Sequence, residues 1–278
     1  MRQRHWHIHR QVTGIQGMIK FAANLTMLFN EHDFLHRFAA AAAAGFEGVE
    51  YLFPYDYEAD ILAHQLERHG LRQVLHNLPA GNWAAGERGI ACLPGREGEF
   101  QDGVARAITY ARTLNCPQLN CLVGIPPADA DREKVHATLV SNLRFAARAL
   151  EAQSIRLLVE PINSYDMPGF YLNRTAQTLA LFDAIGESNL WLQYDIYHMQ
   201  RMEGELATTM RKHLARIAHI QLADNPGRHE PGTGEINYGF LFSELQAIGY
   251  DGWIGCEYKP KTSTIEGLIW LARARAGL

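Results

Sequence analysis

The sequence predicts a single-domain (β/α)8 barrel, and three observations support that fold class. Short apolar or β-branched runs recur eight times, and each is followed by an amphipathic stretch with room for one crossover helix. The runs begin 25 to 45 residues apart, with no long linker between them. The 278 residues of the chain also suit one complete barrel. A doubly wound open sheet is the alternative, but its usual glycine-rich phosphate loop has no match in the sequence.

The expected strands are nearly continuous apolar runs, which is typical of parallel strands buried on both faces. LLVEPI and WIGCEY show this pattern most clearly. The eight expected strands are Phe21–Leu25, Gly48–Phe53, Gln73–Leu78, Gln118–Val123, Arg156–Ile162, Leu190–Ile196, Ala218–Leu222 and Gly252–Tyr258.

Start and stop signals mark the helices between these runs. Asp33 precedes FLHRFAAAAAA, whose larger apolar residues share one face, and Gly45 ends that segment. The segment Tyr57–His69 repeats the pattern and stops at Gly70. The remaining expected helices are 100–114, 133–152, 175–185, 206–214, 238–248 and 263–276.

The first eighteen residues differ from the rest of the chain. They are basic and rich in histidine, and they lack the apolar core of a secretory signal. We expect residues 1–18 to be a disordered extension or the product of an upstream mis-start, with the barrel spanning 19–278. The alternating His5, His7 and His9 leave metal binding as a second interpretation.

Composition excludes several classes of protein. The 26 basic and 30 acidic residues give a net charge of −4, which disfavours nucleic acid as a partner. No apolar run approaches the roughly 20 residues that span a membrane, so no membrane partner is expected. The four cysteines show no CxxC spacing, which predicts neither a zinc knuckle nor a disulfide framework. We therefore expect a cytoplasmic protein.

Polar residues at the ends of the last four strands predict a metal site. Glu160, Asp195, Gln221 and Glu257 occupy these ends, and the carboxyl ends of barrel strands form the active-site mouth. Three carboxylates meeting there would repel one another unless a cation neutralised them. Each acid alone could equally be a helix cap or an ion-pair partner. Three carboxylates and one amide oxygen together suit Mg²⁺ or Mn²⁺.

Other side chains near the predicted mouth are candidates for substrate contact. His76 follows the third strand run, and His198 lies three residues after Asp195. Lys259 lies two residues after Glu257, and would point the same way on an extended strand. Arg228 belongs to the loop before the eighth strand. The histidines could also be ordinary buried or loop residues, Lys259 could pair with Glu257, and Arg228 could be solvated.

A long loop, residues 81–99, separates the third strand from its helix, and loops of this length are often lids. Arg88 or Arg96 in this loop could meet an anionic substrate. Cys92 has no histidine partner evident in the sequence, so nucleophilic catalysis is not expected.

The chain resembles the xylose isomerase-like TIM-barrel superfamily, and within it the hydroxypyruvate isomerase branch. The resemblance runs from Phe21 to about Trp270. It is carried by FAANLTMLF, GVEYLFPYDY, LHNLPAGNWAAGERGIACLPGRE, NCLVG, VEPIN, QYDIYHMQRMEGEL, ADNP, EPGTGEINY and GWIGCEYKP. These segments are specific together, whereas any one of them alone would not be.

The resemblance implies a metal-dependent aldose–ketose isomerase. It implies that Glu160, Asp195, Gln221 and Glu257 bind a divalent cation, and that Glu160 and Glu257 are the proton-transfer pair. The implied reaction interconverts hydroxypyruvate and tartronate semialdehyde (2-hydroxy-3-oxopropanoate) through a cis-enediolate. The resemblance also allows a homo-oligomer.

Three alternatives remain beside this interpretation. A 2-oxo-tetronate isomerase, or an isomerase of another small sugar acid, would use the same metal and glutamates. A non-catalytic sugar-acid binding protein would not need both members of the proton-transfer pair. An endonuclease IV-like enzyme needs a trinuclear zinc cluster built with many histidines, where this chain has Asn120, Cys121 and Gln221.

Overall fold

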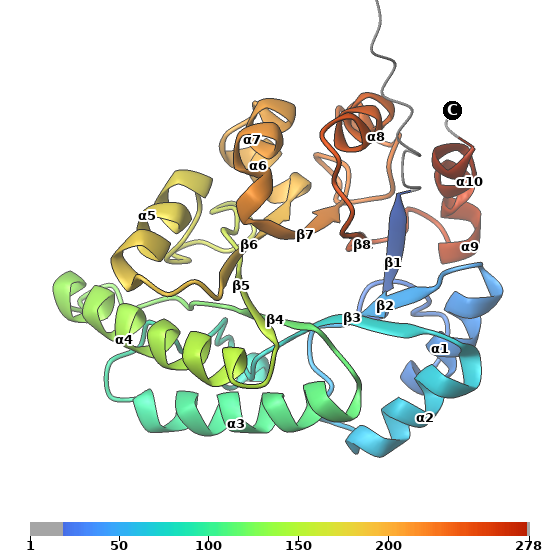
Figure 1. The fold of residues 1–278 in the computed structure, drawn as a ribbon. Helices are drawn as coiled ribbons and strands as arrows, with labels where there is room; N and C mark the ends of the chain where they lie inside the picture. Colours follow the sequence, from blue (N-terminus) through green and yellow to red (C-terminus); the bar gives the residue numbers. More distant parts are fainter. Residues whose placement is uncertain (1–18, 277–278) are drawn as a thin grey trace, which may run out of the picture.

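A computed structural model describes residues 19–276 of the chain and shows a closed barrel of eight parallel strands. The strands follow one another around the barrel in chain order, and β1 closes it by pairing with β8. The helices lie outside the strands (Figure 1). The predicted fold class is therefore confirmed. The expected extension at residues 1–18, with its three alternating histidines, lies outside the described residues.

Each of the eight predicted strands contains a strand of the barrel or overlaps one. The strands are β1 (Lys20–Asn24), β2 (Gly48–Glu50), β3 (Arg72–Asn77), β4 (Gln118–Cys121), β5 (Arg156–Val159), β6 (Leu190–Asp195), β7 (Ile217–Leu222) and β8 (Trp253–Cys256). Most are shorter than the apolar runs that contain them, because the runs continue into buried loop residues beyond the last ladder hydrogen bond.

The helices also follow the predicted order. They are α1 (Phe34–Ala43), α2 (Ala59–His69), α3 (Glu97–Thr113), α4 (Arg132–Glu151), α5 (Thr175–Ile185), α6 (Ile196–Met202), α7 (Leu206–His213), α8 (Tyr238–Ala247), α9 (Thr264–Gly267) and α10 (Ile269–Arg275). Two short 3₁₀ helices are η1 (Trp83–Ala85) and η2 (Leu214–Arg216).

The helices depart from the prediction in three places. Helix α6 was not expected; it begins directly after Asp195, whose carboxylate accepts a hydrogen bond from the backbone N–H of Tyr197 and so caps the helix. Helix α3 begins at Glu97 rather than residue 100, because acidic residues in its first turn favour an earlier start. The final predicted helix is divided into α9 and α10 around Leu268.

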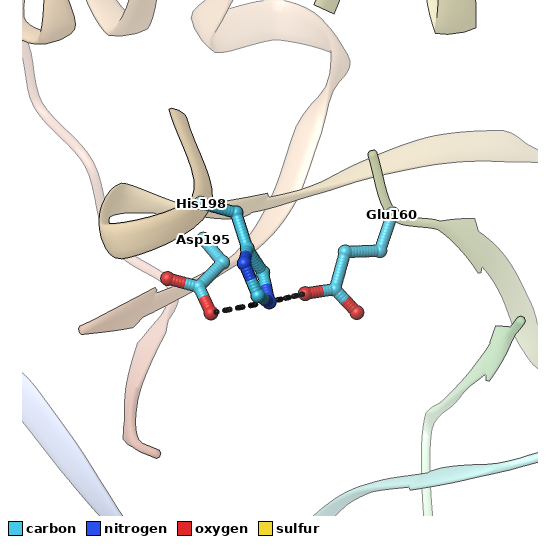
Figure 2. Close-up of side chains that lie close together, drawn as sticks. All are labelled: Glu160, Asp195 and His198. Atoms are coloured by element: carbon cyan, nitrogen blue, oxygen red, sulfur yellow. Dashed lines mark ion pairs between the residues drawn. The ribbon is translucent and has the colours of Figure 1, made fainter. Parts of the chain in front are cut away.

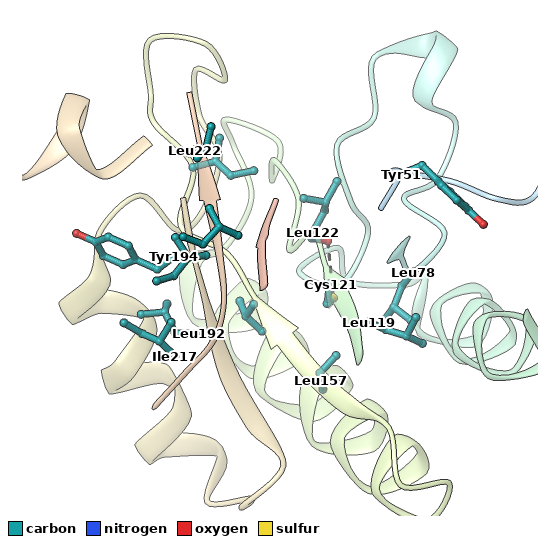
Figure 3. Packing of buried hydrophobic residues seen from close by; sticks show 14 of the residues in the cluster. Tyr51, Leu78, Leu119, Cys121, Leu122, Leu157, Leu192, Tyr194, Ile217 and Leu222 are labelled. Atoms are coloured by element: carbon teal, nitrogen blue, oxygen red, sulfur yellow. Dashed lines mark hydrogen bonds between the residues drawn. The ribbon is translucent and has the colours of Figure 1, made fainter. Parts of the chain in front are cut away.

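Strands β1 and β5 alternate between two apolar environments with the period of two that extended backbone imposes. Side chains such as Phe21, Ala23 and Leu157 belong to the large core that contains helix as well as strand residues, part of which Figure 3 shows. A smaller separate cluster contains Ala22 and Leu158, together with Val74, Leu75 and Ala218. We assign this cluster to the barrel interior, whose polar upper end holds the site described below.

No helix among residues 19–276 is both long enough and apolar enough to cross a membrane.

The loop before α3 packs its backbone directly against the end of β4. Gly89 has a φ of +110°, and a Cβ on it would lie 2.0 Å from the carbonyl oxygen of Leu122. The backbone N–H of Cys92 donates to the carbonyl of Val123 at 2.9 Å. Only a residue without a side chain fits at Gly89, so this contact holds the 81–96 segment close to the barrel mouth.

We therefore expect Gly89→Ala to destabilise the protein by about 3 kcal/mol, because the backbone at Leu122 must shift. Gly86→Ala is the matched control: Gly86 also has a positive φ, of +95°, but a Cβ on it would have no neighbour within 4 Å. It should cost only about 1 kcal/mol, from backbone strain. Urea unfolding of both variants measures the difference, and equal losses would contradict the close-contact explanation.

Candidate active site

The carboxyl ends of the barrel strands surround a small cavity of about 110 Å³. Strand alternation supplies part of its polar wall, since three polar lining residues come two positions after a residue of the interior cluster: Asn24 follows Ala22, Asn77 follows Leu75, and Glu160 follows Leu158. The size suits a compact metabolite rather than a drug-sized ligand. The cavity is lined by Asn24, Met27, Glu50, Tyr51, Leu52, Leu75, Asn77, Trp83, Leu122, Glu160, Ile162, Met167, Gln193, His198, Gln221, Arg228 and Glu257.

Glu160, Asp195 and His198 form the tightest cluster of potential metal-ligating side chains in the described part of the chain. Nε2 of His198 lies 3.5 Å from Asp195 Oδ2 and 3.7 Å from Glu160 Oε1 (Figure 2). All three side chains are buried. Helix α6 produces this arrangement, because its first turn brings His198 back beside the end of β6.

Each of the two carboxylates has one oxygen in use and one free. Oε2 of Glu160 accepts hydrogen bonds from the amides of Asn120 and Gln193, at 3.3 and 2.9 Å. Oδ1 of Asp195 accepts from the backbone N–H of Tyr197 at 2.8 Å. Oε1 of Glu160 and Oδ2 of Asp195 are buried and find no hydrogen-bond partner among residues 19–276. Two such oxygens in one cluster fit a cation, which would satisfy both.

Burial dominates the electrostatics of the acids. It raises the pKa of Asp195 to about 6 and that of Glu257 to about 8, against the opposing effect of Arg228. Burial also raises the pKa of Glu160 well above its ordinary value, and the neighbouring Glu257 and Asp195 add to the rise. Burial, with Arg228 and Arg201, lowers the pKa of His198 well below its ordinary value. Burial therefore shifts the three acids toward their protonated forms and His198 toward its neutral form.

Arg228 supplies positive charge to this cavity. Its guanidinium lies 3.5 Å from Glu257 Oε2 and 3.9 Å from Asp195 Oδ2, with the carbon of the guanidinium 5.1 Å from the ring centre of Tyr197. Burial by itself would lower the pKa of Arg228, but the surrounding acids raise it above its ordinary value. The backbone of Arg228 has a φ of +54°, a conformation costly for a side chain other than glycine.

Asp224 holds the loop that carries Arg228. Its carboxylate accepts hydrogen bonds from four backbone N–H groups, those of Asn225, Gly232, Gly234 and Ile236. This closed loop supports the unfavourable backbone at Arg228 and keeps its guanidinium in the cavity wall.

The amide of Gln221 is fixed from both sides. Its Nε2 donates to Glu50 Oε1 at 2.8 Å, while its Oε1 accepts from Gln193 Nε2 at 2.6 Å. The second oxygen of Glu50 lies 2.7 Å from Nε2 of His219. Gln193 also donates to Glu160, so the carbonyl oxygen of Gln221 lies on the side of the site where Glu160 is found.

The structure brings six of the predicted residues together around the cavity: Glu160, Asp195, His198, Gln221, Arg228 and Glu257. Five of them line the cavity directly. The sixth, Asp195, does not line it but lies beside Glu160 and His198 in the cluster described above.

His76 does not line the cavity. Its neighbours Leu75 and Asn77 do, so alternation along β3 turns His76 outward, where its ring packs edge-on against Tyr55. Burial lowers the pKa of His76 to about 4. The expectation that His76 contacts substrate is therefore corrected: the next residue, Asn77, faces the cavity instead.

The three other cations that were expected near substrate are held elsewhere. Arg88 stacks on Trp83, at 4.1 Å from the ring centre, and donates to two backbone carbonyls. Arg96 pairs with Glu87 and Glu99 within the same loop. Lys259 is exposed, because β8 ends at Cys256 and the alternation that was expected to align it with Glu257 stops there. The lining residue from the 81–99 loop is Trp83.

Glu50, Gln193 and His219 form part of the site but were absent from the sequence prediction. Glu50 had the same signal as Glu160, an acid closing an apolar strand, and could have been found by that criterion. Gln193 and His219 lie inside their strands, where a single sequence does not distinguish an inward polar residue from one that packs against helices.

The geometry defines a barrel enzyme whose acids, amides and one cation converge at the strand ends, and comparison with known proteins agrees. The family model described as xylose isomerase-like TIM barrel matches residues 38–274, and the chain belongs to this family. Hydroxypyruvate isomerase of Escherichia coli is 59% identical over 254 residues, covering 91% of this chain and 98% of the relative. A 2-oxo-tetronate isomerase of Cupriavidus necator is 50% identical with the same coverage. With these relatives, the chain is an isomerase.

A solved structure agrees with the fold in detail. It is titled AP endonuclease, family 2 from Brucella melitensis, and it matches with a TM-score of 0.90 and 47% identity over 92% of this chain and 98% of that chain. The structure titled L-ribulose 3-epimerase matches with a TM-score of 0.73 at 20% identity, over 94% of this chain and 87% of that chain, and so shows the shared fold.

The raised pKa values predict how the metal-free protein responds to pH. Unfolded Asp and Glu side chains titrate near 4, whereas the folded values reach about 6 for Asp195 and about 8 for Glu257. The folded state therefore binds more protons between these limits. The free energy of unfolding should therefore fall as the pH rises from about 4. The stabilisation that comes from protonated Asp195 and Glu257 is lost only above their folded pKa values.

We expect the melting temperature in EDTA to decrease between pH 5 and pH 8, and Glu257→Gln to reduce the slope. The Glu257 contribution is on the order of a few kcal/mol at pH 8. Thermal unfolding followed by circular dichroism at several pH values measures both slopes. An identical slope in the wild type and the variant would contradict the raised pKa.

Proposed function

We propose that this isomerase interconverts hydroxypyruvate and tartronate semialdehyde. The observation that carries the proposal is the pair of buried glutamates, Glu160 and Glu257, on one small cavity that is also lined by an arginine, Arg228, whose side chain is 16% exposed. Isomerisation of a hydroxy-carbonyl acid needs these three elements: a base, an acid, and a partner for the substrate carboxylate. The 59% identical relative named hydroxypyruvate isomerase supports the choice of substrate.

The glutamates are proposed to move the proton. One takes a proton from the hydroxyl-bearing carbon, and the other returns a proton to the adjacent carbon, while the hydroxyl proton passes to the former carbonyl oxygen. Burial raises the pKa of both groups, which makes each carboxylate a stronger base than an exposed glutamate and each acid able to keep its proton near neutral pH. These transfers balance the atoms of the substrate but leave the first glutamate protonated and the second ionised. The enzyme returns to its starting state when a proton passes from the first glutamate to the second, directly or through solvent.

Glu160, Asp195, Gln221 and Glu257 are the residues proposed to hold a divalent cation, and their all-oxygen donor set favours Mg²⁺ or Mn²⁺. The free oxygens of Glu160 and Asp195 support this assignment. When bound, such a cation supplies Lewis-acid polarisation of the substrate oxygens and neutralises the converging acids.

Arg228 is the proposed partner of the substrate carboxylate. It is the one arginine or lysine among the described residues that line the cavity. Its guanidinium offers several donors, and a carboxylate can accept two of them in parallel. The pairing of Arg228 with Glu257 places the carboxylate end of the substrate beside the proton-transfer residue.

A 2-oxo-tetronate isomerase is the second candidate function, because a relative with that name is 50% identical over the same share of the chain. Both reactions need the same acids and differ in the length of the acid accommodated. The apolar wall formed by Trp83, Leu122 and Met167 is where an additional carbon would be placed or excluded.

The remaining expectations follow from charge and cysteine chemistry. The net charge of −4 and the small cavity support a small-molecule substrate rather than nucleic acid. All four cysteines are buried free thiols, which supports a reducing compartment and so the cytoplasm.

The substrate proposal predicts turnover of hydroxypyruvate that EDTA removes and Mg²⁺ or Mn²⁺ restores. Initial rates with hydroxypyruvate and 2-oxo-tetronate, measured side by side after metal removal and re-addition, test it. A higher kcat/KM for 2-oxo-tetronate would favour the second candidate. Absence of reaction with both substrates under every metal would overturn the isomerase proposal for these acids.

Glu257→Gln should lower kcat by about 10² to 10⁴-fold, because the amide cannot accept or donate the transferred proton. Substrate affinity should remain measurable, since Arg228 is unchanged. Glu67→Gln makes the same chemical change at an exposed position on α2 and should leave the rate unaltered. Stopped-flow or coupled assays give kcat, and an unchanged kcat in Glu257→Gln would exclude the assigned role.

A further inference from the structure

Asn163 lies behind the active-site histidine, in the loop that follows β5. The residue is fully buried, three positions after Glu160. Its side-chain oxygen accepts hydrogen bonds from the backbone N–H groups of Tyr165 and Asp166, at 3.0 and 2.8 Å. Two backbone donors on one atom identify that atom as the oxygen of the amide, so the orientation of the amide follows from its partners.

The amide nitrogen of Asn163 must therefore point the other way. It lies 3.1 Å from Asp166 Oδ2 and 2.6 Å from Nδ1 of His198. An amide NH₂ group has two hydrogens and no acceptor lone pair. One hydrogen meets the carboxylate of Asp166, and the other meets His198. Nδ1 of the ring must then be the acceptor, because a hydrogen on Nδ1 would face the hydrogen of the amide.

The opposite edge of the ring is the edge that reaches the cavity. A neutral imidazole carries one hydrogen, and with Nδ1 unprotonated that hydrogen is on Nε2. Nε2 is the atom nearest to Asp195 Oδ2 and Glu160 Oε1 (Figure 2). His198 therefore presents a hydrogen-bond donor to the site rather than a lone pair.

The polar residues around Asn163 hold it in this orientation. Asp166 Oδ2 also accepts from the hydroxyl of Tyr197 at 2.9 Å, and Asp166 Oδ1 pairs with Arg201 at 2.7 Å. Arg201 is located on α6, the same helix as His198. Rotating the Asn163 amide would place its oxygen against the Asp166 carboxylate and its nitrogen against two backbone N–H groups.

We propose that Asn163 is a positioning residue that fixes the Nε2–H tautomer of His198. His198 is thereby a donor to a substrate oxygen that gains negative charge as the carbon-bound proton leaves, and it is not a ligand of the cation. The substrate half of this inference rests on the proposed function. The tautomer does not, since it follows from hydrogen bonds within the protein.

The variant that isolates the effect is Asn163→Asp combined with Asp166→Asn. Aspartate at 163 keeps an oxygen for both backbone N–H groups but presents a second oxygen to His198, which must then carry a hydrogen on Nδ1. Asparagine at 166 restores a donor–acceptor pair between positions 163 and 166. Asp166→Asn alone is the control for the loss of the Asp166 carboxylate, because it leaves the Asn163 amide facing the ring.

The tautomer is measured by ¹⁵N NMR of protein labelled at histidine, with His198→Gln assigning the signal by its loss. We expect an unprotonated Nδ1 and a protonated Nε2 in the wild type and in Asp166→Asn, and a protonated Nδ1 in the double variant. A protonated Nδ1 in the wild type would overturn the proposal, even if the double variant did not fold. An unchanged tautomer in a folded double variant would also overturn it.

Metal titration tests, without using activity, whether His198 is a ligand of the cation. In calorimetric titrations with Mn²⁺, His198→Gln should bind within about 3-fold of the wild type, whereas Asp195→Asn should lose about 10-fold or more. Equal losses in the two variants would make His198 a ligand and overturn the assignment.

Turnover tests whether His198 donates a hydrogen bond to a substrate oxygen during the reaction. Relative to Asp166→Asn, the double variant should lose about 100-fold in kcat with a smaller change in KM, because a transition-state donor is removed. An altered tautomer with unchanged kcat would overturn the catalytic use of the donor. The wild type could show the expected tautomer and yet turn over neither hydroxypyruvate nor 2-oxo-tetronate. The proposed function would then fail, while the positioning role of Asn163 would stand.

Discussion

The burial of three acids at the mouth of one barrel is the constraint on which the rest of the site depends. Glu160, Asp195 and Glu257 are less than 10% exposed, and the free energy of ionising them is unfavourable in such surroundings. The chain offsets this cost in two ways: the guanidinium of Arg228 lies beside Asp195 and Glu257, and neutral amides donate to Glu160. Because Arg228 adds only one positive charge, the acids retain raised pKa values. That remaining imbalance is what makes the site both receptive to a divalent cation and able to transfer protons.

The barrel converts this constraint into geometry through the two-residue period of its strands. Asp195 pairs in register with Gln221, and Asn24 with Glu50, so polar side chains from neighbouring strands meet at one level. Below them the apolar residues Ala22 and Leu158 belong to the separate interior cluster. A one-residue change of register would reverse inward and outward faces, so the fold and the site are specified by the same pattern.

This explains which parts of the molecule the sequence predicts. The eight strands follow from local apolar runs, and the assembled acids follow from the convergence of strand ends in a closed barrel. His76 shows the limit, because a strand buried on both faces has no polar face to indicate which residues point inward. Lys259 depends on where β8 ends, and Arg88 on how the 81–99 loop folds against Trp83. These positions depend on tertiary packing, which a local pattern does not contain.

The use of amides rather than further cations has a chemical consequence. A lysine or arginine in place of Gln193 would lower the pKa of Glu160 and so make it a weaker base. Its positive charge would also repel a divalent cation bound beside Glu160. An amide orients the carboxylate without doing either. Asn120 and Gln193 occupy Oε2 of Glu160 and leave Oε1 free, while the backbone at Tyr197 occupies one oxygen of Asp195 and leaves the other free. Asn163 applies the same principle to His198, where a neutral donor selects which nitrogen carries the hydrogen. The neutral polar side chains thus determine the direction in which each charged or titratable group acts.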